Sequence, residues 1–183
     1  TAADPAGNVS REATVTVQIL KPADATQYSD TAGSSCRFAA EWMKNTGLFV
    51  GERIGGALCF NEDKTVSRGE FLTMMVKALN IPVDEALSYT GYIDETPNWL
   101  KPYLAAALRS GLTAGLPSSE TGIFGAHESV TGGEAAVMLS NAMDLSVPTS
   151  SMDELNTEEP AWAMSAVAAM NENGFQLTAS QEL

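Results

Sequence analysis

The chain has 183 residues, of which 44% are hydrophobic, so it holds enough apolar side chains to build a packed core. Its 23 acidic and 10 basic residues give a formal net charge of −13, which argues against binding to nucleic acid or to an anionic membrane surface. No stretch approaches the roughly 20 apolar residues that cross a bilayer, and the sequence does not open with a signal peptide. We therefore expect a soluble or secreted part of a longer chain, with no membrane insertion.

Residues 1–22 are expected to form a strand or tail that belongs to a preceding module. Ala13, Val15, Val17 and Ile19 alternate with polar residues, which is the period of a half-buried strand, and Pro22 ends it. The segment resembles the closing strand of a bacterial immunoglobulin-like module. Because one strand cannot form a domain, we expect most of that module to lie upstream. The alternative is a strand that packs on the helical part.

The rest of the sequence repeats itself with a period of 64 residues. The stretch 60–79 returns as 124–143 without a gap. The matched pairs include glycines, aromatic residues and capping residues: Tyr28 and Tyr92, Asp30 and Asp94, Gly47 and Gly111, Gly51 and Gly115, Phe60 and Phe124, Val66 and Val130, Glu70 and Glu134. A fixed period with such matches predicts stacked supersecondary units that share one core.

Each unit is expected to begin with an amphipathic helix that ends at a glycine. Apolar residues fall on one face of 34–46 and of 100–110, and Gly47 and Gly111 follow in position for a left-handed cap. In the third unit the offset is 63, because Trp162 matches Trp99 and Gly174 matches Gly111.

A second helix is expected to start at a capping box, in which two side chains satisfy the free amides of a helix start. Ser67 with Glu70, and Thr131 with Glu134, have the required spacing. Thr178 with Gln181 predicts a third box, at which the second helix of the last unit is barely begun. The predicted divisions are residues 1–22, a first repeat 23–88, a second 89–149 and a shortened third 150–183.

The two cysteines leave two alternatives open. Cys36 and Cys59 align with Leu100 and Ile123 of the second unit, so we expect both thiols to be buried side by side. They are either reduced core thiols or a disulfide in an oxidising compartment. Two cysteines and one histidine, His127, do not fit a zinc site, and we expect no metal or other cofactor.

The combined motifs resemble the S-layer homology family over residues 27–183. They are a Tyr-x-Asp opening, a helix that ends in glycine, a Phe before a turn, and Ser-Arg-Gly-Glu at a helix start. The resemblance implies a mainly α fold in which three helix-loop-helix repeats form a pseudo-trimeric bundle. It further implies an extracellular, non-enzymatic module that binds secondary cell-wall polysaccharide, often pyruvylated, in grooves between repeats.

The resemblance also implies a set of glycan-binding residues. An Arg at a helix start can grip a carboxylate, and an aromatic face can cover a sugar ring. The matching residues are Arg68, Asp30, Asp94, Trp99, Trp162 and Glu70. Each also has a structural interpretation: the carboxylates could cap turns or helices, and the tryptophans could pack in the core.

Departures from the family motif predict one competent groove at most, centred on Arg68. Gly132 and Ala179 stand where the other two Arg residues are expected, and Ser35 replaces the first aromatic residue. Thr157 replaces the third opening Asp, unless Asp153 serves instead. The alternative function is a degenerate module that acts as a structural spacer or protein-docking unit. An incomplete third repeat would also favour self-association.

Overall fold

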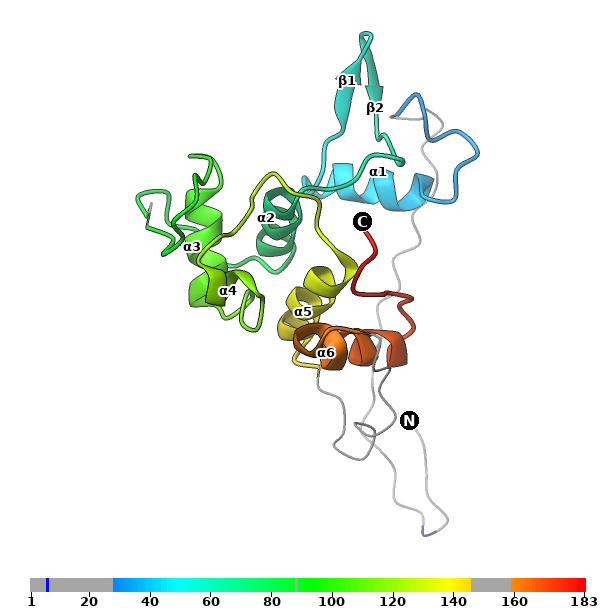
Figure 1. Cartoon of the computed structure of the whole chain (residues 1–183). Helices are drawn as coiled ribbons and strands as arrows, with labels where there is room; N and C mark the ends of the chain where they lie inside the picture. The colour runs from blue at the N-terminus through cyan, green and yellow to red at the C-terminus, as the bar shows by residue number, and fades with distance from the viewer. Residues whose placement is uncertain (1–5, 7–27, 88, 146–158) are drawn as a thin grey trace.

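The computed structural model describes residue 6 and residues 28–87, 89–145 and 159–183. Over these residues the protein is mainly helical, with one small antiparallel sheet (Figure 1). The strand expected within residues 1–22 lies outside the described residues, as do Asp153 and Thr157.

Six helices and one hairpin follow one another along the described chain. In order they are α1 (Arg37–Asn45), β1 (Glu52–Ile54), β2 (Ala57–Cys59), α2 (Arg68–Ala78), α3 (Lys101–Arg109), α4 (Ser118–Thr121), α5 (Gly132–Met143) and α6 (Ala161–Glu172). The two strands pair in the register Glu52 to Cys59, and Figure 1 shows their hairpin projecting beyond α1. α3 packs on α2, and α6 packs on α5.

The three predicted helix stops are confirmed. Gly47, Gly111 and Gly174 have φ angles of +72°, +77° and +89°, which is the left-handed region that glycine adopts without steric cost. Each amide donates to the carbonyl three residues earlier, and the amide of the following residue donates to a carbonyl one position further back. This pair of hydrogen bonds closes the C-terminus of α1, α3 and α6 in the same way.

Two of the three predicted capping boxes are confirmed. The hydroxyl of Ser67 accepts from the amide of Glu70, whose carboxylate accepts from the amide of Ser67 in return. Thr131 and Glu134 make the same reciprocal pair at the start of α5. These contacts satisfy backbone donors that a helix start otherwise leaves free.

Three segments that are distant in sequence meet in a closed ring of backbone hydrogen bonds. The amide of Val66 donates to the carbonyl of Leu183 at 2.7 Å, that of Leu183 to Val130 at 3.1 Å, and that of Val130 to Val66 at 2.9 Å. Each residue therefore donates to one neighbour and accepts from the other. Leu183 holds the position that Val66 and Val130 hold in their own segments.

The predicted third capping box at Thr178 and Gln181 is wrong. The amide of Gln181 donates to the carbonyl of Thr178 at 3.3 Å, as Lys64 does to Asn61 and Glu128 does to Gly125, both at 3.0 Å. Residues 177–183 thus form a turn equivalent to those that precede α2 and α5 in the other two segments. Nineteen residues separate Gly47 from Val66, but nine separate Gly174 from Leu183, so the loop between helix stop and ring is ten residues shorter.

The main core lies between α2, α3, α5 and the turn before α5. Leu72, Leu104, Phe124, Val130 and Met138 are fully buried there. A smaller cluster joins α5 to α6 through Ala136, Ala163, Val167 and Met170. Each segment is therefore held to the next by a contact between two helices: α2 packs on α3, and α5 packs on α6.

We predict that Gly51→Ala is more destabilising than Gly115→Ala, although both glycines have positive φ angles, of +79° and +83°. A Cβ on Gly51 would lie 2.6 Å from the carbonyl oxygen of Cys59 and would also collide with the ring of Tyr28, whereas on Gly115 its nearest neighbour is Val137 at 3.9 Å. Gly115→Ala should lose about 1–2 kcal/mol of unfolding free energy through backbone strain alone, and Gly51→Ala roughly 2 kcal/mol more. Urea denaturation of both variants measures the difference, and equal losses would contradict the packing at Gly51.

Candidate functional site

The start of α2 is docked on the turn that precedes α5. The amide of Arg68 donates to the carbonyl of Glu128 at 2.8 Å, and that of Gly69 to Ala126 at 3.0 Å. The same junction occurs 64 residues later, where the amide of Gly132 donates to Gln181 at 2.6 Å and that of Gly133 to Ala179 at 3.2 Å. The first amides of a helix, which have no partner within that helix, therefore donate to carbonyls in the turn of the following segment.

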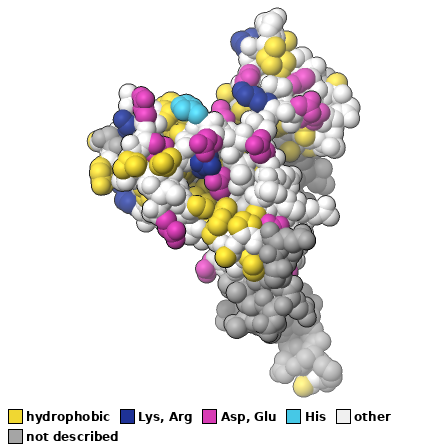
Figure 2. Space-filling view, in the orientation of Figure 1, with side chains coloured by type: hydrophobic (Ala, Val, Ile, Leu, Met, Phe, Trp, Pro, Cys, Tyr) yellow, Lys and Arg dark blue, Asp and Glu magenta, His cyan; other side chains and the backbone are white. Residues whose placement is uncertain are grey.

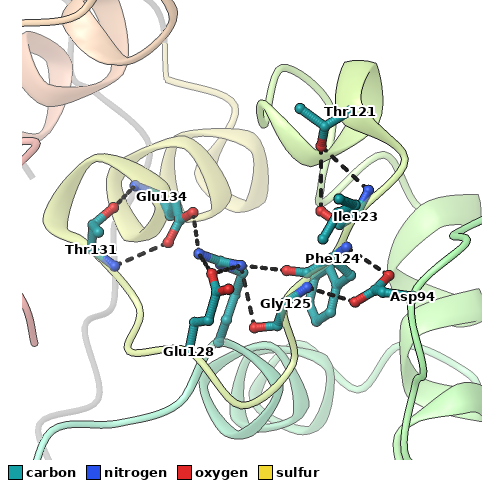
Figure 3. A network of polar contacts seen from close by, with 9 residues as sticks. Asp94, Thr121, Ile123, Phe124, Gly125, Glu128, Thr131 and Glu134 are labelled. Carbon is teal, nitrogen blue, oxygen red and sulfur yellow. Dashed lines mark hydrogen bonds and ion pairs between the residues drawn. The ribbon is translucent and has the colours of Figure 1, made fainter.

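The side chain of Arg68 is enclosed at the first of these junctions. Its Nη1 donates to the carbonyl of Phe124 and, at 3.2 Å, to that of Gly125, while Nη2 pairs with Oε1 of Glu134 at 2.8 Å. Glu128 is 3.3 Å from both nitrogens. Figure 3 shows this network running from the turn at Phe124 to the capping box at Thr131 and Glu134.

Arg68 is therefore already paired within the protein. Its exposed fraction is 9%, and two carboxylates surround one guanidinium group, so the local charge is negative. A positive side chain at a helix start is unfavourable unless an anion accompanies it, and here Glu134 and Glu128 fulfil that role. The geometry gives Arg68 a cross-linking contact between segments through its two Nη atoms, while its Nε is buried without a hydrogen-bond partner among the described residues.

The second junction explains why glycine stands at the predicted Arg position. A Cβ on Gly132 would collide with the carbonyl oxygen of Thr178. The φ angle of Gly132 is not positive, so the requirement is for space and not for an unusual backbone conformation. The shortened third segment approaches too closely for a side chain at this position.

The two predicted tryptophans lie over the next glycine of each helix start. A Cβ on Gly69 would lie 3.5 Å from Cη2 of Trp99, and one on Gly133 would lie 2.9 Å from Cη2 of Trp162. Trp99 and Trp162 remain 50% and 37% exposed. Each indole therefore covers a helix start with one part and keeps another part open to solvent.

Asp30 and Asp94 are both turn caps in the structure. Asp30 accepts from the amides of Phe60 and Asn61 at 2.9 and 2.7 Å, and Asp94 accepts from those of Phe124 and Gly125, both at 2.9 Å. Burial raises the pKa of Asp94, but these amides and the charge of Arg68 outweigh it and hold that pKa below its usual value.

Glu159 has a related role in the third segment, which the sequence reasoning missed. Its Oε2 accepts from the amide of Ala179 at 2.9 Å. Glu159 lies three residues before Trp162, whereas Asp94 lies five residues before Trp99, so the spacing of the second repeat pointed to Thr157 instead.

The thiols are free and half-buried, so the expectation of burial side by side is wrong. Sγ of Cys36 donates to Oε2 of Glu62 at 2.8 Å, and Sγ of Cys59 lies 3.3 Å from the hydroxyl of Ser29. Burial and then the carboxylate of Glu62 raise the pKa of the Cys36 thiol, which keeps it protonated. The part of the chain that the structure describes contains no cluster of three or more metal-ligating side chains.

An open polar cleft of about 350 Å³ lies beside Asp94 and was not predicted. Thr96, Asn98 and Lys101 line it, and Nζ of Lys101 donates to Oδ1 of Asn98 at 2.9 Å. Thr96 is 6% exposed, and its hydroxyl has no hydrogen-bond partner among the described residues. Tyr89, at 87% exposed, and Tyr92 border the same cleft. The cleft combines hydroxyl, amide and ammonium groups with aromatic rings, and Asp94 and Glu95 also line it, so its acidic residues outnumber its one basic residue.

Two further observations concern the charge of the molecular surface and the hydropathy of the helices. Figure 2 shows acidic side chains spread over the visible face, with a few Lys and Arg residues between them. Across the described residues, no helix has the length and apolar character that crossing a membrane requires.

Comparisons with known proteins give no match: no family model matches the chain, and no curated protein is similar to it in sequence.

We predict that Arg68→Ala destabilises the protein by about 3–5 kcal/mol, because it leaves the carboxylate of Glu134, 12% exposed, without its partner. Arg53→Ala is the control, since this exposed side chain reaches only the carbonyl of Gly56 at 3.4 Å; it should change stability by less than about 0.5 kcal/mol. Urea denaturation measures both. An unchanged midpoint for Arg68→Ala would contradict the cross-linking role.

We predict that Asp94 contributes to stability above about pH 4 and that this contribution is lost in acid. Its pKa is lowered in the folded protein, so the stabilisation is present above the unfolded pKa and falls as the pH drops through the folded pKa. Asp94→Asn should cost about 1.5–3 kcal/mol at pH 7 and should flatten the loss of stability below about pH 4. Urea denaturation at pH 7, 4 and 3 tests this. The control variant Asp63→Asn, at an exposed position, should keep the wild-type dependence of stability on pH.

Proposed function

We propose that the chain is a module of the S-layer homology type, with three helical repeats arranged about a pseudo-threefold axis. Three recurring features support this: the glycine stops of α1, α3 and α6, the turns at residues 61–64, 125–128 and 178–181, and the ring of Val66, Val130 and Leu183. Each segment supplies one equivalent element to the ring. This is the relation expected of three copies of one ancestral unit.

We further propose that the module retains an exported protein on the bacterial cell wall by binding an anionic, possibly pyruvylated, wall polysaccharide. The observation that carries this proposal is the polar cleft beside Asp94. The amide of Asn98 suits sugar hydroxyl groups, and Lys101 can pair with a ketal carboxylate. Tyr89 offers an exposed aromatic face for the apolar side of a sugar ring. The role needs no catalysis and no cofactor.

The proposed glycan site differs from the groove that Arg68 was expected to form. Arg68 is paired with Glu134 and Glu128, whereas among the described residues Lys101 has a hydrogen bond to the neutral side chain of Asn98 and no ion pair. Asp94 and Glu95 line the same cleft, so an anionic ligand would have to reach Lys101 against the repulsion of two acidic residues. Because the whole protein is strongly acidic, the affinity should depend on this local charge and weaken with salt.

A second candidate is a structural spacer or protein-docking unit. The specific observation in its favour is that both junctions at which the family motif would place an anion-binding Arg are closed. Arg68 is buried at one of them, and Gly132 leaves no room for a side chain at the other. In this alternative the cleft beside Asp94 has no ligand of its own.

Co-sedimentation with purified cell-wall sacculi tests the proposal, before and after the wall-linked polysaccharide is stripped, at low and moderate salt. We expect wild-type chain to bind intact sacculi and to be released by stripping. The double variant Asn98→Ala with Lys101→Ala should bind at least roughly tenfold more weakly, which is the loss of one charge-assisted contact. Arg53→Ala removes one positive charge far from the cleft and should bind as the wild type does.

The alternatives give different results. Equal binding of the wild type and the double variant would move the glycan site away from the cleft. No binding under any condition would contradict the anchoring function and leave the spacer or docking unit. Far-ultraviolet circular dichroism of each variant checks that a loss of binding is not a loss of folding.

A further inference from the structure

A second depression, which we call the Lys77 pocket, lies at the end of α2, where this helix packs on α3 (Figure 1). Its volume is about 370 Å³, and it shares no lining residue with the cleft beside Asp94. The residues that line it are Val76, Lys77, Asn80, Ile81, Val83 and Tyr103. The pocket is therefore formed by one helix end, the chain that follows it, and the first turn of the helix packed beside it.

The backbone around the pocket is fixed by the end of α2. The amide of Asn80 donates to the carbonyl of Lys77 at 3.1 Å, and that of Ile81 donates to the carbonyl of Val76 at 3.0 Å. This is the pair of hydrogen bonds that also closes the three helices ending at glycine. Asn80 takes the glycine position with a φ angle of +51°, which asparagine tolerates better than most residues. The pocket is thus shaped by local hydrogen bonds within the protein.

Three polar groups in the pocket are unpaired among the described residues. Nζ of Lys77 lies 5.8 Å from the centroid of the Tyr103 ring, a cation–π contact that positions the ammonium group without neutralising its charge. No hydrogen bond or ion pair is formed there by this ammonium group, by the side-chain amide of Asn80 or by the hydroxyl of Tyr103. The pocket therefore offers an ammonium, an amide and a phenol that the fold leaves available.

The charge of the pocket differs from that of the rest of the molecule. Lys77 is the one charged side chain among the described residues that line it, although the whole chain has a net charge of −13. Ile81 and Val83 are half-buried against the main core and supply an apolar floor. The pocket therefore combines a local positive charge with an apolar surface.

The equivalent place in the next segment has different chemistry. Asn141, Asp144 and Ala166 stand where the lysine, the asparagine and the tyrosine of the pocket are expected from the repeat. The side-chain amide of Asn141 donates to the carbonyls of Leu112 and Ala114 at 3.0 and 2.9 Å. That site holds no positive charge, and its amide is used within the protein. The unpaired groups of the Lys77 pocket are therefore not needed to close a junction of this kind.

We propose that the Lys77 pocket binds a carboxylate carried on a sugar ring. The ammonium group of Lys77 pairs with the carboxylate, while the amide of Asn80 and the hydroxyl of Tyr103 bind ring hydroxyl groups. Ile81 and Val83 contact the apolar face of the ring. The inference rests on the proposed function for its class of ligand, an acidic glycan, and adds a second contact on a face that carries no competing carboxylate among the described lining residues.

Glucuronate is the probe, because it carries one carboxylate on one sugar ring. It is titrated into the whole 183-residue chain, and binding is followed through amide chemical shifts. We expect saturable changes at residues 76–83 and at Tyr103 in the millimolar range, weakened by added salt. Glucose, which has the ring without the charge, and acetate, which has the charge without the ring, should each bind at least roughly tenfold more weakly.

Variants of the protein separate the charge from the fold. Lys77→Gln should weaken the binding of glucuronate by at least roughly tenfold, whereas Lys77→Arg keeps the charge and should retain binding. Asn80→Asp should weaken binding as well, and Asp144, with a φ angle of +52°, shows that the backbone accepts Asp at the equivalent position. Arg53→Ala removes an equal charge from the exposed hairpin and should leave binding unchanged.

Several outcomes would overturn the proposal. These are equal affinity for glucuronate and glucose, equal affinity for glucuronate and acetate, unchanged binding by Lys77→Gln, and no saturable change up to roughly 50 mM glucuronate. Shift changes confined to residues 94–101 would place the sugar acid in the cleft beside Asp94, which removes this pocket but leaves the proposed function standing. The expected changes at residues 76–83, in a chain that does not bind sacculi, would keep the pocket and contradict the anchoring function.

Discussion

The structure depends on one kind of contact, in which the first amides of a helix donate to the turn of the following segment. A helix start leaves several N–H groups without intrahelical partners, and here the carbonyls of Ala126, Glu128, Ala179 and Gln181 accept four of them. The hydrogen bonds that satisfy the first amides of a helix therefore also hold the turn of the following segment in place. This contact brings the backbones so close that a Cβ on Gly69 would lie 3.0 Å from the carbonyl oxygen of Ala126 and one on Gly132 would collide with that of Thr178.

Arg68 shows how this contact changes the role of a recognisable motif. At a helix start an Arg needs an anion, and an isolated motif cannot specify whether that anion is a ligand or part of the protein. Glu134 supplies it from inside, while its other oxygen completes a capping box. The motif thereby becomes a cross-link between two segments. The ammonium group of Lys101, by contrast, donates to the neutral amide of Asn98, although Asp94 and Glu95 line the same cleft.

The cleft beside Asp94 is a surface to which we assign glycan binding. It is polar and bordered by exposed aromatic rings, which suit the apolar side of a sugar, and Asp94 and Glu95 line it together with Lys101.

The sequence by itself determined the features that depend on neighbours within about four residues. The glycine stops at Gly47, Gly111 and Gly174, and the boxes at Ser67 and Thr131, follow from local hydrogen-bond geometry and recur at offsets of 64 residues, or 63 for Gly174. Only the tertiary structure decided the register of residues 177–183, the partners of Arg68 and the cleft at Thr96. The partners of Arg68 lie 56 to 66 positions away in the chain and those of Leu183 lie 53 and 117 positions away, so local patterns cannot specify them, while the cleft at Thr96 is formed by the irregular segment 89–98 and the start of α3.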